Sequence, residues 1–471
     1  MKRNNVIIIL LMSLQAVLAQ ETTPVALGEG TGVRLYTLSQ LKDSALSNNI
    51  ALRSARLSVE AARQQRKEAF TKYFPNISGT GLWFNANRGM AKIDIDPSEY
   101  ITPELGAVLA QSLPAEALAA LANPMSTTMM KNGTLASISA VQPVFAGGQI
   151  VNGNKLAKVG EDVSRLQMQL SEQEVEKTVE QYYWQLASLH EKEKTVNAVD
   201  TLLRDIYKDV EVAVGAGVAL RNDLLQVQLR LNDIESQRLK LQNGIGIVRQ
   251  LLGQYCGLSP QSFQIKDGSA YAFGIIVPEI SRQDHSLPAT LAESAEVSQL
   301  PEYQLLGKQV EATKLQERMA IGQQLPTVAV GAGYNYHNLM ENDRTFGMVF
   351  ATVSIPISDW WGGSHAIKRH KIERQKAVEQ LEDNTQLLQI RMQNARNGVT
   401  EALQQLEIAE RSIGQAEENL RLNRNYYKAG TTKMSDLLEA QLLYQQALDH
   451  RIDAFADYQN KLLEYQHAIG Q

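Results

Sequence analysis

Proline is absent from two long blocks of this chain, residues 144–259 and residues 357–471. Because a proline inside a helix costs ~3 kcal/mol, blocks without it can form helices of unusual length. Within these blocks apolar residues recur in steps of three and four, as from Leu388 to Leu420. Such a sustained seven-residue period is typical of helices that pack side by side as coiled coils. A helix from about Gln149 to Val212 would be on the order of 95 Å long, which excludes a compact globular domain.

Each block is interrupted once by a short segment that begins with a glycine, Gly217 in the first block and Gly430 in the second. The segments that follow align without gaps at a constant offset of 213, with identical glycine, aspartate, paired leucines and glutamine. Glycine suits the left-handed residue that ends a helix, and polar residues commonly start the next one. We therefore predict two helical hairpins whose tips contain Gly217 and Gly430.

The two halves of the chain also resemble one another upstream of these blocks. Residues 49–84 and residues 300–335 share a helical pattern, then a proline, then an alternating segment. The sequence therefore predicts two tandem copies of one unit, residues 20–258 and residues 289–471. Residues 259–288, which contain three prolines, are predicted to form a linker in an equatorial region between the copies.

Each copy contains two segments in which apolar and polar residues alternate, which predicts strands at about 75–86 and 134–144, and at about 326–337 and 347–357. Strands of about ten residues with one apolar face suit a transmembrane β-barrel, and they also suit a soluble sheet with one buried face. The four strands of one chain cannot close a barrel. If they span a membrane, several chains would therefore have to share one barrel. The long, alanine-rich connection at 87–133 is predicted to lie outside the cell.

The N-terminus has the pattern of a secretory signal peptide. Lys2 and Arg3 precede an apolar run from Val6 to Met12, and Ala19 ends a segment suited to cleavage. The run is shorter than the ~20 residues that a transmembrane helix needs. We therefore assign residues 1–19 to a signal peptide and predict an exported protein.

Composition excludes several classes of function. The net charge of −5 offers no electrostatic footprint for nucleic acid. A single cysteine, Cys256, excludes an intramolecular disulfide and a cysteine-based metal site. No zinc-protease motif, nucleophile elbow or phosphate loop occurs in the sequence. We therefore predict no enzyme activity, no cofactor and no metal site.

At the junctions between predicted strands and long helices lie Val141–Gly148 and Val353–Gly363, and the second tip lies within Tyr426–Gln441. With these motifs and the order of elements, the chain resembles the TolC-type outer membrane efflux protein family. The resemblance implies an α+β fold: an all-antiparallel transmembrane β-barrel, with four strands from each copy of a homotrimer, continued by a long α-helical coiled-coil tunnel.

The same resemblance implies a location and partners. The barrel would lie among the lipids of the outer membrane of a Gram-negative bacterium, and the helices would extend into the periplasm. The implied partners are a periplasmic adaptor (membrane fusion) protein and an inner-membrane pump of the RND or ABC type.

In that family, carboxylates near the second tip surround the narrowest point of the channel. By position these are Asp436 and Glu439, which lie one helical turn apart on one face. A ring of carboxylates would favour cations and repel anions. Without the resemblance, the same residues are well explained as carboxylates in the first turn of a helix, where the helix dipole favours them.

The family also has a network that closes the tips, joining an aspartate and a tyrosine to an arginine. Asp223 and Tyr427 match the first two positions, while the arginine position is Thr432, with Lys433 next to it.

The leading functional prediction is a passive outer-membrane exit duct, gated at its periplasmic tip. The alternative that the sequence leaves open is a non-conducting structural coiled-coil protein of the cell envelope, a spacer or adhesin.

Overall fold

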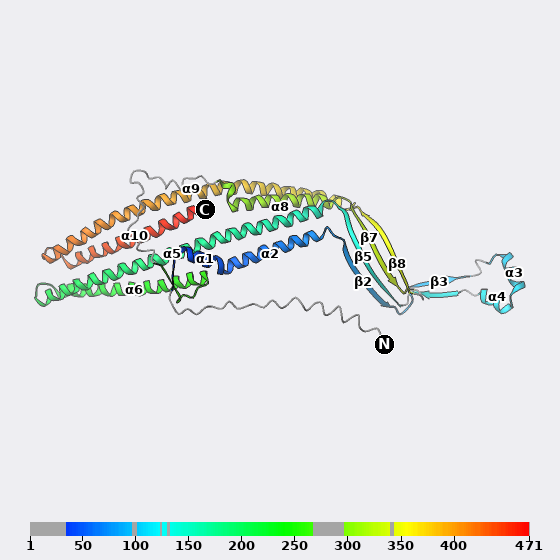
Figure 1. Cartoon of the computed structure of the whole chain (residues 1–471), viewed down its shortest axis with the longest axis horizontal. Coiled ribbons are helices and arrows are strands. Elements are labelled where there is room, and N and C mark those ends of the chain that lie inside the picture. Colours follow the sequence, from blue (N-terminus) through cyan, green and yellow to red (C-terminus); the bar gives the residue numbers. More distant parts are fainter. Residues whose placement is uncertain are drawn as a thin grey trace.

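A computed structural model describes residues 34–96, 101–122, 125–129, 132–266, 296–339 and 343–470. The predicted signal peptide and residues 267–288 of the predicted linker lie outside these ranges. The molecule is long and narrow. Two helical hairpins occupy one end, a β-sheet lies beyond them, and a thin arm projects from the far end of the sheet (Figure 1).

Four long helices form the hairpins. α5 (Gln149–Gly215) has 67 residues and α9 (Asp359–Lys428) has 70, so each is roughly 100 Å long. α6 (Arg221–Cys256) and α10 (Met434–Ala468) return beside them. Among the described residues no helix is long and apolar enough to cross a membrane.

The apolar residues of the α5 heptads pack into a core that the two hairpins share. The buried stripe of α5 continues for most of the helix, and near the tips it packs with Val227 and Ile234 of α6 and with Leu437 of α10. Helix α5 continues beyond Val212, because Ala213 to Gly215 keep helical geometry before the left-handed turn at the tip.

Shorter elements lie between the hairpins and the sheet. α2 (Ile50–Thr71) packs against α5, and α8 (Pro301–Gln323) packs against both α5 and α9. α1 (Leu38–Asn48) precedes α2, and the short helix η3 (Val297–Gln299) precedes α8. Near the middle of the molecule, β1 (Arg34–Tyr36) pairs in parallel with β6 (Phe263–Ile265). Strand β6 lies within residues 259–266, the described part of the predicted linker region.

The main sheet has four antiparallel strands in the order β2-β5-β7-β8. These are β2 (Asn76–Asn85), β5 (Asn132–Ala146), β7 (Thr327–His337) and β8 (Arg344–Ser354). Strand β8 begins and ends three residues before the predicted 347–357 segment. The reason is the pairing register: β7 begins at Thr327, whose partner is Ser354, so later residues have no strand opposite them.

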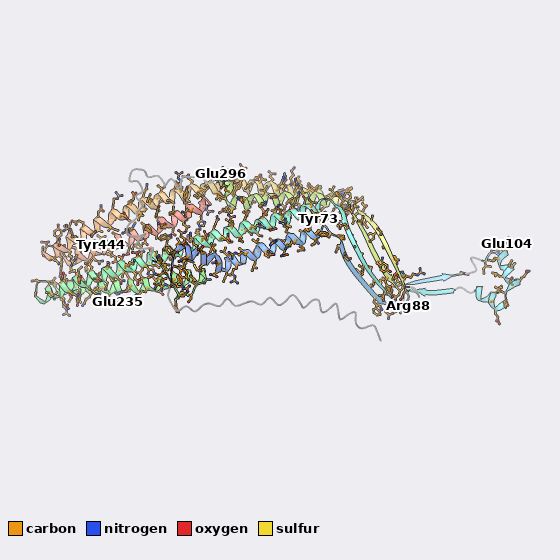
Figure 2. The ribbon with its side chains drawn as sticks, in the orientation of Figure 1. Tyr73, Arg88, Glu104, Glu235, Glu296 and Tyr444 are labelled. Atoms are coloured by element: carbon orange, nitrogen blue, oxygen red, sulfur yellow. The ribbon has the colours of Figure 1, made fainter. Side chains whose placement is uncertain are left out.

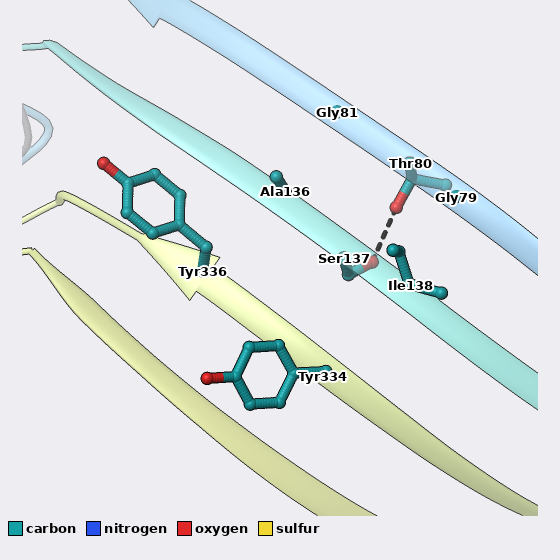
Figure 3. A pocket seen from close by; sticks show the side chains of 8 residues that line it. All are labelled: Gly79, Thr80, Gly81, Ala136, Ser137, Ile138, Tyr334 and Tyr336. Atoms are coloured by element: carbon teal, nitrogen blue, oxygen red, sulfur yellow. Dashed lines mark hydrogen bonds between the residues drawn. The ribbon is translucent and has the colours of Figure 1, made fainter. Parts of the chain in front are cut away.

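Directly paired residues of an antiparallel sheet share a face, so the register separates two faces. One face has Ile77, Ala140, Ala332 and Val349 in a single row across the strands. The opposite face contains hydroxyl pairs, among them the Thr80 and Ser137 side chains, whose oxygens lie 2.7 Å apart (Figure 3). The predicted alternation is therefore present on all four strands.

The predicted connection at 87–133 is more structured than an open loop. Strands β3 (Ala91–Ile95) and β4 (Met125–Met129) pair as an antiparallel ribbon, and between them lie α3 (Pro103–Ser112) and α4 (Ala115–Ala122). The result is the arm that extends beyond the sheet (Figure 1). The connection was predicted only as a loop between two strands, and its alanine-rich part is suited to the two short helices.

Candidate functional site

The two hairpin tips have matching backbone geometry. Gly217 and Gly430 are left-handed, with φ of 76° and 69°. In each tip the amide that follows the glycine donates a 2.9 Å hydrogen bond to the carbonyl five residues earlier. This is the Schellman arrangement, which satisfies carbonyls left over at a helix end. The predicted turn residues therefore lie where each long helix ends.

The matching aspartates begin the returning helices. The Asp223 carboxylate accepts a hydrogen bond from the Leu220 amide at 3.3 Å, and the Asp436 carboxylate accepts one from the Lys433 amide at 3.4 Å. Each aspartate thus satisfies a backbone donor at the start of its helix. Asp436 lies in the first turn of α10, the position that the alternative explanation by the helix dipole assigns to it.

Asp436 accepts two further hydrogen bonds. The Thr432 hydroxyl donates at 2.7 Å and the Ser435 hydroxyl at 3.1 Å. The Thr432 hydroxyl is the main cause of a lowered pKa of Asp436, followed by the Lys433 amide and Ser435. The carboxylate is therefore charged at neutral pH.

The start of α10 is amphipathic around these carboxylates. Met434, Leu437 and Ala440 are buried against the other helices, whereas Asp436 and Glu439 are exposed. Because residues three apart lie on the same side of a helix, the two carboxylates form one acidic face directed away from the chain's own core. Such a face can act electrostatically on ions outside this single chain.

Two of the three residues assigned to a closing network interact electrostatically across the tips. Burial, and then the negative charge of Asp223, raise the pKa of Tyr427, which lies near the end of α9. Lys433 interacts instead with Asp436 in its own tip, through its backbone amide and its charge. Among the contacts of the described residues, none joins the Lys433 side chain to Asp223.

Sequence reasoning missed an ion pair between the hairpins. The Lys428 ammonium of α9 lies 3.6 Å from the Asp209 carboxylate of α5. Both side chains are more than half exposed, so the pair contributes little to stability. No local pattern could indicate it, because its members belong to different helices.

Sequence reasoning also missed a buried polar cluster that joins α6 to α10 above the tips. The Arg230 guanidinium donates to the side-chain oxygens of Gln441 at 3.1 Å and of Gln445 at 2.9 Å. Gln445 donates in turn to the Gln237 oxygen at 2.8 Å. Gln441 is fully buried, and burial lowers the pKa of Arg230. Gln441 belongs to the matched tip segments, which was the one signal available in the sequence.

The hairpin region, like the rest of the described chain, contains no group of three or more histidine, cysteine, aspartate or glutamate side chains placed to hold a metal ion. Figure 2 shows how side chains cover the full length of the helices, with Tyr444 and Glu235 in the half nearer the tips. The candidate site is the exposed acidic surface that Asp436 and Glu439 form at the start of α10.

Comparison with known proteins identifies the family. The sequence matches the outer membrane efflux protein family over residues 41–257 and 306–471, most of the chain. No curated protein sequence matches it.

Solved structures with a similar fold come from several channels. CusC is 16% identical, with a TM-score of 0.73 over 96% of this chain and 99% of that one. The outer membrane protein VceC of Vibrio cholerae is 15% identical, with a TM-score of 0.69 over 92% and 96%. The CmeC outer membrane channel of Campylobacter jejuni is 14% identical, with a TM-score of 0.69 over 92% and 85%. At these identities the likeness establishes the fold. The family match adds the biological class: this chain belongs to the outer membrane efflux protein family, whose members are outer-membrane channels of Gram-negative bacteria and not enzymes.

Proposed function

We propose that this protein is the passive exit duct of a tripartite efflux or export system. Three copies share one β-barrel in the outer membrane, and their helices form a tunnel through the periplasm. A periplasmic adaptor and an inner-membrane pump of the RND or ABC type complete the system and supply the energy. The sequence contains no phosphate loop or catalytic motif that could drive transport, so the energy is assigned to the partners.

The observation that carries this proposal is the pair of open edges of the main sheet. β2 and β8 are the outer strands, and neither has a partner on its outer side among the described residues. An unpaired backbone group in lipid costs several kcal/mol, so both edges need partners in a membrane. Because the four strands alternate in direction, β8 of one copy is antiparallel to β2 of the next. Copies of the chain can therefore close a continuous antiparallel barrel.

The dimensions of the sheet fit a membrane. A strand of ten residues such as β2 is ~34 Å long, and at a tilt of ~40° it spans ~26 Å, close to the apolar band of outer-membrane barrels. Ile77, Ile138 and Val349 are exposed on the apolar face. Exposed aromatic residues gather toward both ends of the sheet, as expected for membrane interfaces. They are Tyr73, Phe74 and Trp361 at the helical end, and Trp83 and Tyr334 at the other.

Figure 3 shows part of this face, where Tyr336 of β7 is paired with the small residue Ala136 of β5, and Tyr334 with Ile138. Gly79 and Gly81 of β2 line one shallow surface depression together with these residues.

The tandem organisation of the chain is part of the proposal. Helix α9 ends at Lys428 and α10 begins at Met434, each 213 residues after the end of α5 and the start of α6. The halves therefore share element boundaries as well as sequence motifs. Two similar units in each of three copies would give the tunnel six similar hairpins.

We further propose that Asp436 and Glu439 form the gate. In an assembly of copies, each tip would add one pair of carboxylates to a ring around the axis. Asp436 is held in place by its three hydrogen bonds, and its lowered pKa keeps it charged. Asp223 and Tyr427 link neighbouring hairpins in the closed tip. The positive charge of Lys433, in the second tip, partly offsets the negative charge of the acidic ring.

Single-channel conductance in a planar bilayer tests the proposal. The variant Asp436→Ala/Glu439→Ala should conduct more than the unsubstituted protein and should prefer cations less. A matched control is Glu382→Ala/Asp383→Ala, which removes the same charge from exposed positions of α9. These lie about 70 Å from the tip along the helix, so the control should leave conductance unchanged.

Equal conductance and selectivity in all three proteins would refute the acidic gate while leaving the duct intact. No conductance from any of them, in samples with full helical content, would favour the non-conducting structural protein.

A further inference from the structure

The inner side of the helices next to the sheet is identified by a groove that continues into the sheet. Pro143 and Ala146 of β5 line this groove together with residues of α2, α5 and α8. Pro143 pairs with Ala329 and Ala146 with Thr327, on the polar face of the sheet. The groove therefore continues the polar face, and the opposite side of the helices continues the apolar face. We call this opposite side the outer side.

Basic residues gather on the outer side of α5 and α8. Gly153 and Gly160 of α5 line the inner groove, so at 100° per residue Lys155 and Lys158 fall on the opposite side. A second groove lies there between the two helices, and its exposed basic residues are Lys155, Lys158, Lys314 and Arg318. The outer groove is therefore basic.

Helix α2 repeats this arrangement. Gln65 and Lys72 line the inner groove, so Arg63 and Lys67 fall on the outer side, where both are exposed. At the sheet end the same side carries Phe74, which is 55% exposed. Exposed basic residues therefore follow an exposed aromatic residue on this side of the helix.

The two halves of the chain keep these charges at matching positions. The prolines before β2 and β7 align α2 with α8 at an offset of 251, and the tip offset of 213 aligns α5 with α9. Four pairs of basic residues result: Arg63 and Lys314, Lys67 and Arg318, Lys155 and Lys368, and Lys158 and Lys371. All eight are exposed, and two pairs exchange lysine for arginine, so the repeat retains the charge. We call these eight residues the basic belt.

The basic belt lies at one level below the sheet. On three helices its nearer residue is seven positions from an exposed apolar residue at the sheet end; the pairs are Lys67 and Phe74, Arg318 and Leu325, and Lys368 and Trp361. On α5, Lys155 is seven positions from Gly148, which precedes the helix. Seven positions correspond to ~10 Å along a helix, and the second belt residue of each helix lies ~5 Å further.

The basic belt has an unbalanced positive charge. Among the ion pairs of the described residues, only Arg63 of the belt takes part, in an exposed 3.7 Å contact with Glu60. The acidic residues of the outer groove, Asp162 and Glu311, instead contact the Lys308 ammonium, at 3.0 and 3.1 Å. Like charges repel one another, so a belt of this kind is suited to an anionic partner.

We propose that the basic belt binds the phosphate groups of anionic phospholipids in the periplasmic leaflet of the outer membrane. The inference rests on the proposed position of the sheet in that membrane, and it adds the class of lipid that the helices meet below the sheet. The shape of the belt supports a membrane as the partner, because its charges lie at one level on four helices, beside exposed apolar residues. A linear peptide would instead need charges along one helix.

The distances fit the headgroup layer of a bilayer. The polar region on each side of the hydrocarbon core is ~5–8 Å thick, so a belt ~10 Å below the apolar residues lies at its outer boundary. Lysine and arginine side chains are long enough to extend their charged groups toward phosphates from there. Each basic residue near an anionic membrane surface strengthens binding about fivefold, and salt screens the attraction.

Lipid binding by the full-length protein tests the basic belt. Native mass spectrometry counts the phosphatidylglycerol and phosphatidylcholine molecules that the solubilised protein retains from an equimolar mixture. The unsubstituted protein should retain phosphatidylglycerol in preference, and less so as the salt concentration rises. The preference should fall at least tenfold when the nearer row is neutralised, as in Lys67→Gln/Lys155→Gln/Arg318→Gln/Lys368→Gln.

A matched control removes the same charge from the hairpins, tens of ångströms from the sheet. Its substitutions are at exposed positions, as in Lys208→Gln/Lys240→Gln/Arg396→Gln/Arg411→Gln. The control should keep the preference for phosphatidylglycerol. A control that loses as much of the preference as the belt variant would overturn the assignment to these eight residues.

Conductance in a phosphatidylcholine bilayer separates the belt from the duct. Both variants should keep the helical circular dichroism signal and conduct like the unsubstituted protein, because the belt lies on the outer side. Conducting protein without a preference for phosphatidylglycerol, or with the same preference in the belt variant, would overturn the belt and leave the duct intact. Protein that fails to conduct, yet loses the preference only in the belt variant, would overturn the duct and support the belt. Binding of soluble polyphosphate without any lipid preference would overturn the assignment to lipid.

Discussion

Arg230 offers the sharpest test of how the gate helix is held. Its guanidinium reaches from α6 to Gln441 and Gln445 of α10, a few residues beyond the proposed gate carboxylates. Its closest acidic neighbour, Asp233, lies 3.9 Å away and is largely exposed. The guanidinium therefore relies on the side-chain oxygens of Gln441 and Gln445 as its hydrogen-bond acceptors, and these oxygens rely on it as their donor. We expect Arg230 to act as a positioning residue for α10.

Arg230→Ala should cost about 2–3 kcal/mol of unfolding free energy. The substitution leaves two buried carbonyl oxygens without a donor, at ~1–3 kcal/mol each. Removing a largely buried charge relieves part of that cost, because burial of Arg230 is itself unfavourable. We therefore expect a loss at the low end of the summed range of ~2–6 kcal/mol. Replacing Arg230 together with both glutamines, as in Arg230→Met/Gln441→Leu/Gln445→Leu, should recover most of the loss, since only the half-buried Gln237 oxygen then loses its donor.

The assay combines stability with conductance. Denaturant midpoints followed by the helical circular dichroism signal should fall for Arg230→Ala and return toward the unsubstituted value in the triple variant. Resting conductance should rise in the single variant, because α10 loses its buried contact with α6. A single variant as stable as the unsubstituted protein, or a triple variant that is weaker still, would refute this account of the cluster.

Other predictions concern the tips and the core. Gly217→Ala or Gly430→Ala should cost ~1–2 kcal/mol locally, because alanine is strained in the left-handed conformation, and faster hydrogen exchange at that tip would reveal it. Leu203→Ala should lower the unfolding free energy by ~2–5 kcal/mol, since Leu203 is fully buried, and an unchanged denaturant midpoint would contradict this. The pKa of Asp436 is lowered by folding, so the stabilisation by its cap should be complete above the ordinary carboxyl pKa of ~3.9. It should be lost as the pH falls through the pKa of the folded state. Amide hydrogen exchange at the second tip, measured from neutral to acid pH, should therefore stay slow until the pH reaches that pKa. Cys256, with a pKa of about 12, should resist alkylation at mildly alkaline pH until the chain unfolds.

The sequence alone determined the elements whose cause is local. Proline-free blocks with a seven-residue period became α5 and α9, because helix formation and an apolar stripe depend on neighbours a few residues apart. Gly217 and Gly430 ended those helices, because glycine adopts the left-handed conformation at little cost. Alternation predicted four strands, although the end of β8 depended on its partner.

Only the tertiary structure decided which distant segments meet. Strand β5 of the first half lies beside β7 of the second, and this places β2 and β8 at the open edges. Arg230 meets Gln441 across 211 residues of sequence, and Tyr427 comes under the influence of Asp223. No periodicity encodes such pairs, because they depend on how whole helices and strands pack. For the same reason the open edges of the sheet are known only from the folded structure, in which β5 and β7 are paired on both sides and β2 and β8 on one side only.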